Sequence, residues 1–393
     1  MRSGAVAPAA SWPPARQYLR TVKVGIVVPY SWSYWGAVPE HAELKAEALQ
    51  RLGVETRTLM GHDPPGSFTR VLHPRHGRHG QPPADVIPVG RSVIVPANGA
   101  LPNIILSPAA VPRIKRILER ERFDLVHLHE PMTPIVCTAV MAWARCPVVA
   151  TFHASGGLGW LHAGRPVWGF LMDRIDHRIA VSDAARESAA RWFPGDYEVI
   201  PNGVLIPAGA EAGGRENHVV FIGRHDPRKG MPVLLRAWPE IYRRTGARLR
   251  LVGADPLMVR LALSRVGEED AEGIDALGFL SQEDLTAELL AAKALVAPSL
   301  GGESFGMVLT RAFACATPVV ASDITGYRDV MTDETGVLVP PDDPGALTDA
   351  VAGLLADEPR RQRFGAASRR LAQERYSWDD IARRLSAIYE GLA

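Results

Sequence analysis

Three cations lie within six positions of one another in the stretch RHDPRKG, directly after the apolar run VVFIG. They are Arg224, Arg228 and Lys229, and the run before them is typical of a strand that leads into a helix. Guanidinium and ammonium groups gathered in such a turn suit the charges of a polyphosphate. A solvated basic loop is the alternative, because charged side chains are common on any protein surface.

A second turn, GGESFGMVLTRAF, begins at residue 301 and has the composition of an anion site. Its glycines allow a backbone to approach closely, Ser304 is expected to cap the next helix, and the amides at that helix end attract anions. Glu303 can accept hydrogen bonds from sugar or ribose hydroxyls. Together with the basic turn, this stretch predicts a site for a nucleotide diphosphate and its sugar.

Histidines end two of the predicted strands. His129 closes DLVHLH and precedes Glu130, which predicts a position at the mouth of a ligand cleft. His127 points to the same face deeper in the sheet and is interpreted as a structural residue. His153, in ATFHASGG, is expected to support the site from behind or to face the acceptor.

Two motifs are missing from the sequence, and their absence narrows the chemistry. No Asp-x-Asp pair occurs, and no G-x-G-x-x-G follows a strand-like run. A metal held by paired carboxylates is therefore not indicated, and a dinucleotide dehydrogenase is disfavoured. We expect no metal and no cofactor, so that Arg, Lys and backbone amides must meet the charge of a leaving diphosphate.

Apolar β-branched runs alternate with helical patterns in two separate series, which predicts an α/β fold with two Rossmann-like domains and parallel sheets facing a cleft. The tract LIPAGAEAGGREN separates the two series. Residues 1–20 are rich in Ala, Pro and Arg and are expected to be disordered. The expected divisions are an extension over 1–20, an acceptor and membrane-side domain over 21–205, a donor domain over 206–374 and a closing helix over 375–393, whose SWDD start is a capping signal.

The chain has 393 residues with 44 basic and 43 acidic side chains, so no overall charge favours nucleic acid as a partner. Its three cysteines have no metal-ligand spacing and are expected to be reduced thiols in a cytoplasmic protein. No run is long and apolar enough for a membrane span. The segment AAVPRIKRILERERFD, residues 109–124, instead predicts a basic amphipathic helix that can dock on an anionic membrane, although a solvated helix face is the alternative.

Eight segments, in order along the chain, resemble retaining GT-B glycosyltransferases of family GT4, and in particular the phosphatidylinositol alpha-mannosyltransferases. They are VGIVVPYSW, VPANGA, FDLVHLHEP, VVATFHAS, RIAVSDAAR, VIPNGV, FIGRHDPRKGMPVLL and APSLGGESFGMVL. The resemblance implies transfer with retention by a front-face route, in which positioning and charge stabilisation dominate.

The resemblance also implies roles for single residues. Arg224 and Lys229 match the pair that holds the donor diphosphate, and His129 matches the histidine beside the transferred sugar. Glu303 matches the first carboxylate of the family's E-x7-E motif. The implied sets are catalytic His129, Glu303, Arg224 and Lys229; donor-binding Gly36, Arg224, Lys229, Gly302, Glu303, Ser304, Phe305, Gly306 and Arg311; acceptor-side Asn98 and His153; and membrane-facing Arg113, Lys115, Arg116 and Arg120.

The sequence departs from the family pattern around the donor. Arg311 stands where the second carboxylate of E-x7-E is expected to hold the ribose, and Gly36-Ala37 replaces a Gly-Gly turn. The basic turn is one residue shorter than in relatives, and GADP stands where they carry G-R-G-D-E. A cation cannot make the hydrogen bonds of a carboxylate to a diol, so donor affinity or donor identity is expected to change.

These observations predict a hexosyltransferase at the inner face of the cell membrane that moves mannose from GDP-mannose onto a phosphatidylinositol-like lipid. The expected partners are a nucleotide sugar, a lipid acceptor and an anionic membrane surface. Two alternatives stay open: a GT4 enzyme with another nucleotide sugar and a soluble acceptor, and a catalytically silent GT-B protein that binds lipid or a partner. Nucleotide release from a panel of donors separates the three.

Overall fold

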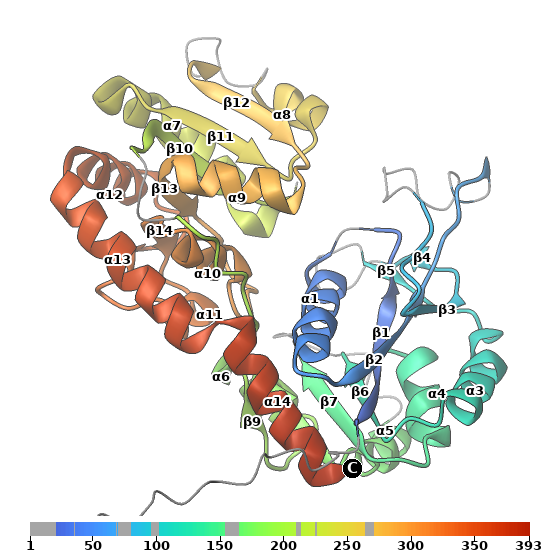
Figure 1. The fold of residues 1–393 in the computed structure, drawn as a ribbon. Coiled ribbons are helices and arrows are strands. Elements are labelled where there is room, and N and C mark those ends of the chain that lie inside the picture. Colours follow the sequence, from blue (N-terminus) through green and yellow to red (C-terminus); the bar gives the residue numbers. More distant parts are fainter. Residues whose placement is uncertain are drawn as a thin grey trace, which may run out of the picture.

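The computed structural model describes residues 21–34, 36–67, 69, 80–95, 102–153, 165–209, 214–224, 226–263 and 271–393. Two α/β units are visible in Figure 1, each with helices packed around a sheet. The predicted fold class is confirmed.

The first sheet is built mainly from parallel strands in the order β3-β2-β1-β6-β7-β8-β9. Its central strands are apolar because helices cover both faces of such a sheet; Val24, Ile26 and Val27 of β1 are fully buried. Short β4 and β5 pair antiparallel beside β1. The strands are β1 (Lys23–Ser31), β2 (Glu55–Gly61), β3 (Val86–Gly90), β4 (Val93–Ile94), β5 (Asn103–Ile104), β6 (Leu125–His129), β7 (Val148–Phe152), β8 (His177–Ala180) and β9 (Glu198–Val199); the helices are α1 (Ala37–Arg51), α3 (Ala110–Glu121), α4 (Val136–Trp143), α5 (Arg165–Met172) and α6 (Asp183–Ala190).

The second sheet has the order β12-β11-β10-β13-β14-β15, and all its strand pairs are parallel. Side chains that accept backbone N–H groups mark several helix starts, among them Ser281 before α9 and Asp343 before α12. The strands are β10 (Glu216–Ile222), β11 (Arg248–Val252), β12 (Ile274–Gly278), β13 (Ala292–Ala297), β14 (Val319–Ser322) and β15 (Gly336–Val339); the helices are η2 (Pro227–Lys229), α7 (Met231–Thr245), α8 (Pro256–Leu263), α9 (Gln282–Ala291), α10 (Met307–Ala314), α11 (Thr325–Arg328), α12 (Pro344–Ala356) and α13 (Glu358–Arg375).

The strand order reverses direction at one point in each sheet, between β1 and β6 in the first and between β10 and β13 in the second. Ligands of open parallel sheets bind outside the carboxyl ends of the strands at this switch point. The turns that follow β1, β6, β10 and β13 are therefore the turns that should carry chemistry. Gly36, His129, Arg224 and Glu303 all lie in or next to these turns.

The last helix, α14 (Trp378–Leu392), leaves the second unit and packs on the first, as Figure 1 shows. Ser377 accepts the backbone N–H of Asp379, so the capping signal in the sequence is used. Trp378, Ile381 and Leu385 share a core with β1 and α1. This closing helix thus joins the two units through an apolar core.

Helix α3 carries the predicted basic residues on its outer face. Arg113, Lys115, Arg116 and Arg120 are exposed, whereas Ile114 and Ile117 are buried in the core of the first unit. The apolar stripe of the helix is therefore already covered by protein, and only its charged face is open. None of the described helices is long and apolar enough to cross a membrane.

Candidate active site

One cavity is lined by residues from both units and contains two of the predicted donor-binding residues. Gly36 and Ala37 border it from the first unit, at the start of α1, and Arg224 borders it from the second, directly after β10. The backbone of Gly36 is extended, with φ of −168°, so this position does not require glycine for its conformation. The full lining is Tyr30, Ser31, Tyr34, Gly36, Ala37, Val38, Pro39, Pro102, Asn103 and Arg224.

Lys229 and Glu303 form an ion pair at the switch point of the second sheet. Lys229 Nζ donates to Glu303 Oε1 at 2.5 Å, and both side chains are largely shielded from solvent. The turn before Lys229 is held in place because Arg228 donates to both carboxylate oxygens of Asp226, at 3.2 and 2.7 Å. Of the three clustered cations, Arg228 is thus committed to Asp226, and its pairing lowers the pKa of that carboxyl although burial opposes the shift.

Position 230, where this turn enters α7, requires a glycine. Its φ is +70°, and a Cβ added there would lie 1.8 Å from the carbonyl oxygen of Pro298, which precedes the second donor turn. The N–H of Leu300 also donates to the carbonyl of Arg228 at 2.7 Å. The two turns are therefore locked together by backbone contacts, which explains how Lys229 and Glu303 meet.

The expected helix cap by Ser304 is wrong. Helix α10 begins at Met307 after Gly306, which is in the left-handed region, and no side chain caps it. Ser304 therefore does not cap the helix, and its carbonyl instead accepts a hydrogen bond from Ser182. Phe305 is buried and packs edge-on against Tyr376, so its side chain belongs to the core, and its part in donor binding stays a prediction.

Arg311 pairs with Glu40 of α1, across the two units. Both side chains are mostly shielded from solvent. Sequence reasoning identified Arg311 as a departure but did not find its partner, which lies 271 positions away in the chain. The cation therefore acts as a contact between the units in this structure.

His129 ends β6 as predicted, but it is fully buried in a cluster of basic side chains. Its Nε2 lies 2.9 Å from Lys45 Nζ, and its Nδ1 lies 2.8 Å from His153 Nε2. Both ring nitrogens are therefore engaged by the protein. His127 contacts Lys45, Thr151 and Tyr389, in agreement with its interpretation as a structural residue.

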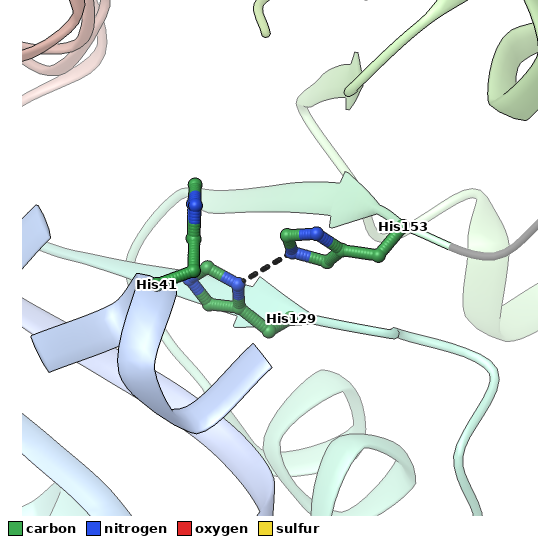
Figure 2. A group of neighbouring side chains, drawn as sticks. All are labelled: His41, His129 and His153. Atoms are coloured by element: carbon green, nitrogen blue, oxygen red, sulfur yellow. Dashed lines mark hydrogen bonds between the residues drawn. The ribbon is translucent and has the colours of Figure 1, made fainter. Parts of the chain in front are cut away.

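Sequence reasoning missed His41 and Lys45, both on α1. Figure 2 shows the ring of His41 beside those of His129 and His153, from which its centroid is 5.4 and 5.0 Å away. Residues four apart share a helix face, and Lys45 lies next to Ala42 and Leu49, both of which are buried. A lysine in that apolar stripe was the available signal.

One nitrogen from each of His41, His129 and His153 lies within 4.8 Å of the other two, a grouping suited to a transition metal. The hydrogen bond between His129 and His153 would have to open, however, and the amine of Lys45 beside His129 would oppose a cation. Metal-independent chemistry stays a prediction.

Burial sets the protonation of this cluster. Desolvation, followed by the charges of neighbouring basic groups, lowers the pKa of His41, His127 and His129 well below 6.5. The same causes lower the pKa of His153 to about 3, and burial lowers the pKa of Lys45 well below 10.5. The four imidazoles are therefore neutral near pH 7. Asn98, the other acceptor-side prediction, lies outside the described residues.

The sequence matches two family models. Residues 38–205 match Glycosyltransferase Family 4, and residues 216–357 match the glycosyl transferases of group 1. The chain is 35% identical over 383 residues to a phosphatidyl-myo-inositol mannosyltransferase of Mycobacterium leprae, covering 95% of this chain and 97% of the relative. It is 34% identical over 387 residues to the protein of the same name in Mycobacterium tuberculosis, with the same coverage.

Solved structures with the same architecture include a sucrose-phosphate synthase from Thermosynechococcus elongatus, with a TM-score of 0.73 and 23% identity over 94% of this chain and 99% of that one. Anabaena HepE in complex with UDP and glucose has a TM-score of 0.69 and 19% identity over 94% of this chain and all of that one. At these identities the likeness establishes the fold.

Proposed function

Because the chain belongs to glycosyltransferase family 4, we propose that it transfers a hexose, with retention, from a nucleotide sugar onto a phosphatidylinositol-like lipid at a membrane surface. GDP-mannose is the donor that the similarity to phosphatidyl-myo-inositol mannosyltransferases favours. One observation carries the proposal: Gly36 of the first unit and Arg224 of the second border the same cavity. A transfer between two substrates held by two domains needs such a shared space.

The second unit supplies the groups that suit a leaving diphosphate. Arg224 follows β10 at the edge of the cavity, and Lys229 lies near the same switch point beside Glu303. When a diphosphate enters, Lys229 can turn part of its hydrogen bonding from Glu303 to phosphate oxygen. Glu303 is then released to accept a hydrogen bond from a sugar hydroxyl, the part that a carboxylate plays best.

The first unit supplies the surface that suits an anionic lipid. Four cations are exposed on α3, and the neighbouring α4 ends in Trp143, which is 41% exposed. Phe170 of α5, the helix that contacts α4, is 71% exposed. Cations beside exposed aromatic rings are typical of proteins that bind the membrane interface.

The test is nucleotide release by the purified protein, with GDP-mannose and a panel of UDP-sugars, each with and without phosphatidylinositol vesicles. Lipid-dependent release of GDP supports the proposal. A Lys229→Met variant should lose the release, and Lys293→Met, which removes a lysine bonded to Asn217 in the second unit, should keep it.

A different donor is the second candidate, and the pairing of Arg311 with Glu40 favours it. The family position that offers a carboxylate to the ribose carries a cation here, and that cation faces a carboxylate on the other unit. Release of UDP without vesicles would replace the first proposal with this one. Failure to bind or cleave any donor of the panel would favour a lipid- or partner-binding protein without activity.

A further inference from the structure

Lys45 is a buried lysine, and no carboxylate among the described residues is paired with its amine. Its exposed fraction is 1%, and within the described part of the chain it forms no salt bridge. Its amine instead faces two imidazoles, at 2.9 Å from His129 Nε2 and 3.3 Å from His127 Nε2. Burying an unpaired ammonium opposes folding, so stability does not explain a lysine at this position.

The amine fixes the direction of the hydrogen bonds around it. An ammonium has three N–H donors and no acceptor, so His129 Nε2 must accept and the proton of the neutral ring must lie on Nδ1. Because Nδ1 is 2.8 Å from His153 Nε2, His129 donates there and His153 accepts. The remaining proton of neutral His153 then lies on its own Nδ1. A neutral amine has two N–H groups and one lone pair, and it sets the same direction when it donates one N–H to each imidazole.

His153 is the last residue of this hydrogen-bonded series and is 7% exposed. It follows β7 at the carboxyl edge of the first sheet, and its Nδ1 forms no hydrogen bond with the described residues. His41 packs beside both rings through edge contacts, and the hydroxyl of Tyr389 from α14 is bonded to His127 on the far side of Lys45. None of these contacts competes for the His153 proton.

We propose that Lys45 is a positioning residue: through His129 it sets the tautomer of His153, so that His153 carries an N–H donor on Nδ1 at the carboxyl edge of the first sheet, where ligands of such sheets bind. The group that it meets is an acceptor, such as a hydroxyl oxygen of the sugar or a phosphate oxygen. The identity of this ligand rests on the proposed function, whereas the positions of the protons on His129 and His153 do not. Without Lys45, neutral His129 can carry its proton on Nε2 in place of Nδ1. His153 can then lose the N–H on its own Nδ1.

Two-bond ¹H–¹⁵N correlation spectra of histidine side chains test the proposal on the protein without ligand. His129→Gln and His153→Asn variants assign the signals. In the wild type we expect His129 and His153 to be Nδ1–H tautomers at neutral pH. A wild-type His129 that carries its proton on Nε2 would overturn the proposal.

Lys45→Met removes the donor while keeping the length of the side chain. We expect the Nδ1–H tautomer of His129 and His153 to be lost or mixed, whereas Thr151→Val, which removes a hydroxyl 2.6 Å from His127 Nε2, should leave both unchanged. Lys45→Leu is the second variant if the methionine variant does not fold, because it also lacks a donor. Tautomers that stay the same in the Lys45 variants would contradict the proposal.

Addition of GDP-mannose to the wild type separates this inference from the proposed function. A shift of the His153 Nδ1 signal supports both. If His129 and His153 are Nδ1–H tautomers but the His153 signal does not shift, the role of Lys45 is supported and GDP-mannose is not the donor. No measurement in the series depends on turnover, so an inactive protein still gives a result.

Discussion

At the scale of single residues, the ion pair of Lys229 and Glu303 holds two opposite charges at the place where a sugar diphosphate should bind. Its partners come from turns that are 74 positions apart and are joined by the contact of Gly230 with Pro298. Such a pair keeps both side chains in place without ligand, and a diphosphate can then replace the carboxylate on the lysine.

Lys229→Met should weaken nucleotide diphosphate binding by about 10- to 150-fold, because loss of a charged hydrogen bond costs about 1.5–3 kcal/mol. Calorimetric titration with the nucleotide identified by the release assay measures the change. Lys293→Met serves as the control, since its partner Asn217 lies at the opposite end of β10 from Arg224. An equal effect of both substitutions would argue against a specific role for Lys229.

The buried histidines predict a dependence of stability on pH. Burial, with neighbouring charges, lowers the pKa of His41, His127, His129 and His153, so the unfolded chain binds more protons than the native one below pH 6.5. The contribution of the histidines to stability is therefore complete above this pH and falls as the pH drops. Each histidine lowers the free energy of unfolding by at most about 1.4 kcal/mol per pH unit.

Urea unfolding at pH 7, 6 and 5 measures this effect as a falling midpoint. Carboxyls with a lowered pKa, such as Asp226 and Asp275, act only below about pH 4.5 and do not mask it. A His41→Asn variant should show a shallower slope, because one buried imidazole is removed. A midpoint that does not change between pH 7 and 5 would show that these histidines are protonated in the folded protein.

At the scale of elements, α3 divides its residues between two tasks. Ile114 and Ile117 anchor the helix in the core, and Arg113, Lys115 and Arg116 remain on the outside. The sequence pattern of a basic amphipathic helix is correct, but its apolar side is used for folding. Membrane binding through α3 should thus rest on charge, with apolar contacts left to Trp143 and Phe170.

Replacing Arg113, Lys115 and Arg116 together by glutamine should reduce binding to phosphatidylinositol vesicles by about 100-fold, since each cation near an anionic surface contributes about 1 kcal/mol. Sedimentation with vesicles at two salt concentrations measures it, and the wild type should weaken at high salt. The matched control replaces Arg363, Arg370 and Arg375, which are exposed on α13. Equal losses in both triple variants would indicate that net charge alone matters.

At the scale of the whole molecule, two of the contacts that join the units differ in character. Helix α14 crosses from the second unit into the core of the first, and Arg311 of α10 pairs with Glu40 of α1. The first contact is apolar and continuous with a core, so it should persist when the units move. The second is polar and sits beside the cleft, where opening and closing would make or break it.

Arg311→Met and Glu40→Gln, separately and together, test the polar contact. Each single change should lower the free energy of unfolding, and the cycle should give a coupling of about 1–2 kcal/mol, because the pair is partly shielded from solvent. Small-angle scattering should show a larger radius of gyration in each single variant. Additive effects with unchanged scattering would mean that the pair does not hold the units together.

The sequence by itself determined the local features of this protein. Alternating apolar runs predicted two parallel sheets, and the positions of His129, Arg224 and Glu303 at strand ends predicted the edge where a site lies. These features follow from the spacing of apolar residues along the chain and from the residue types in the turns, both of which depend on near neighbours only. Eight matching segments were enough to indicate the family.

Only the tertiary structure decided which side chains meet. The pairing of Arg311 with Glu40, the join of Lys45 to His129 and the return of α14 to the first unit connect residues that are far apart in the chain. The burial of Phe305 and the late start of α10 likewise depend on contacts with other elements. Such contacts are set by the register of the sheets and the placement of the units, and no local pattern of residue types contains that information.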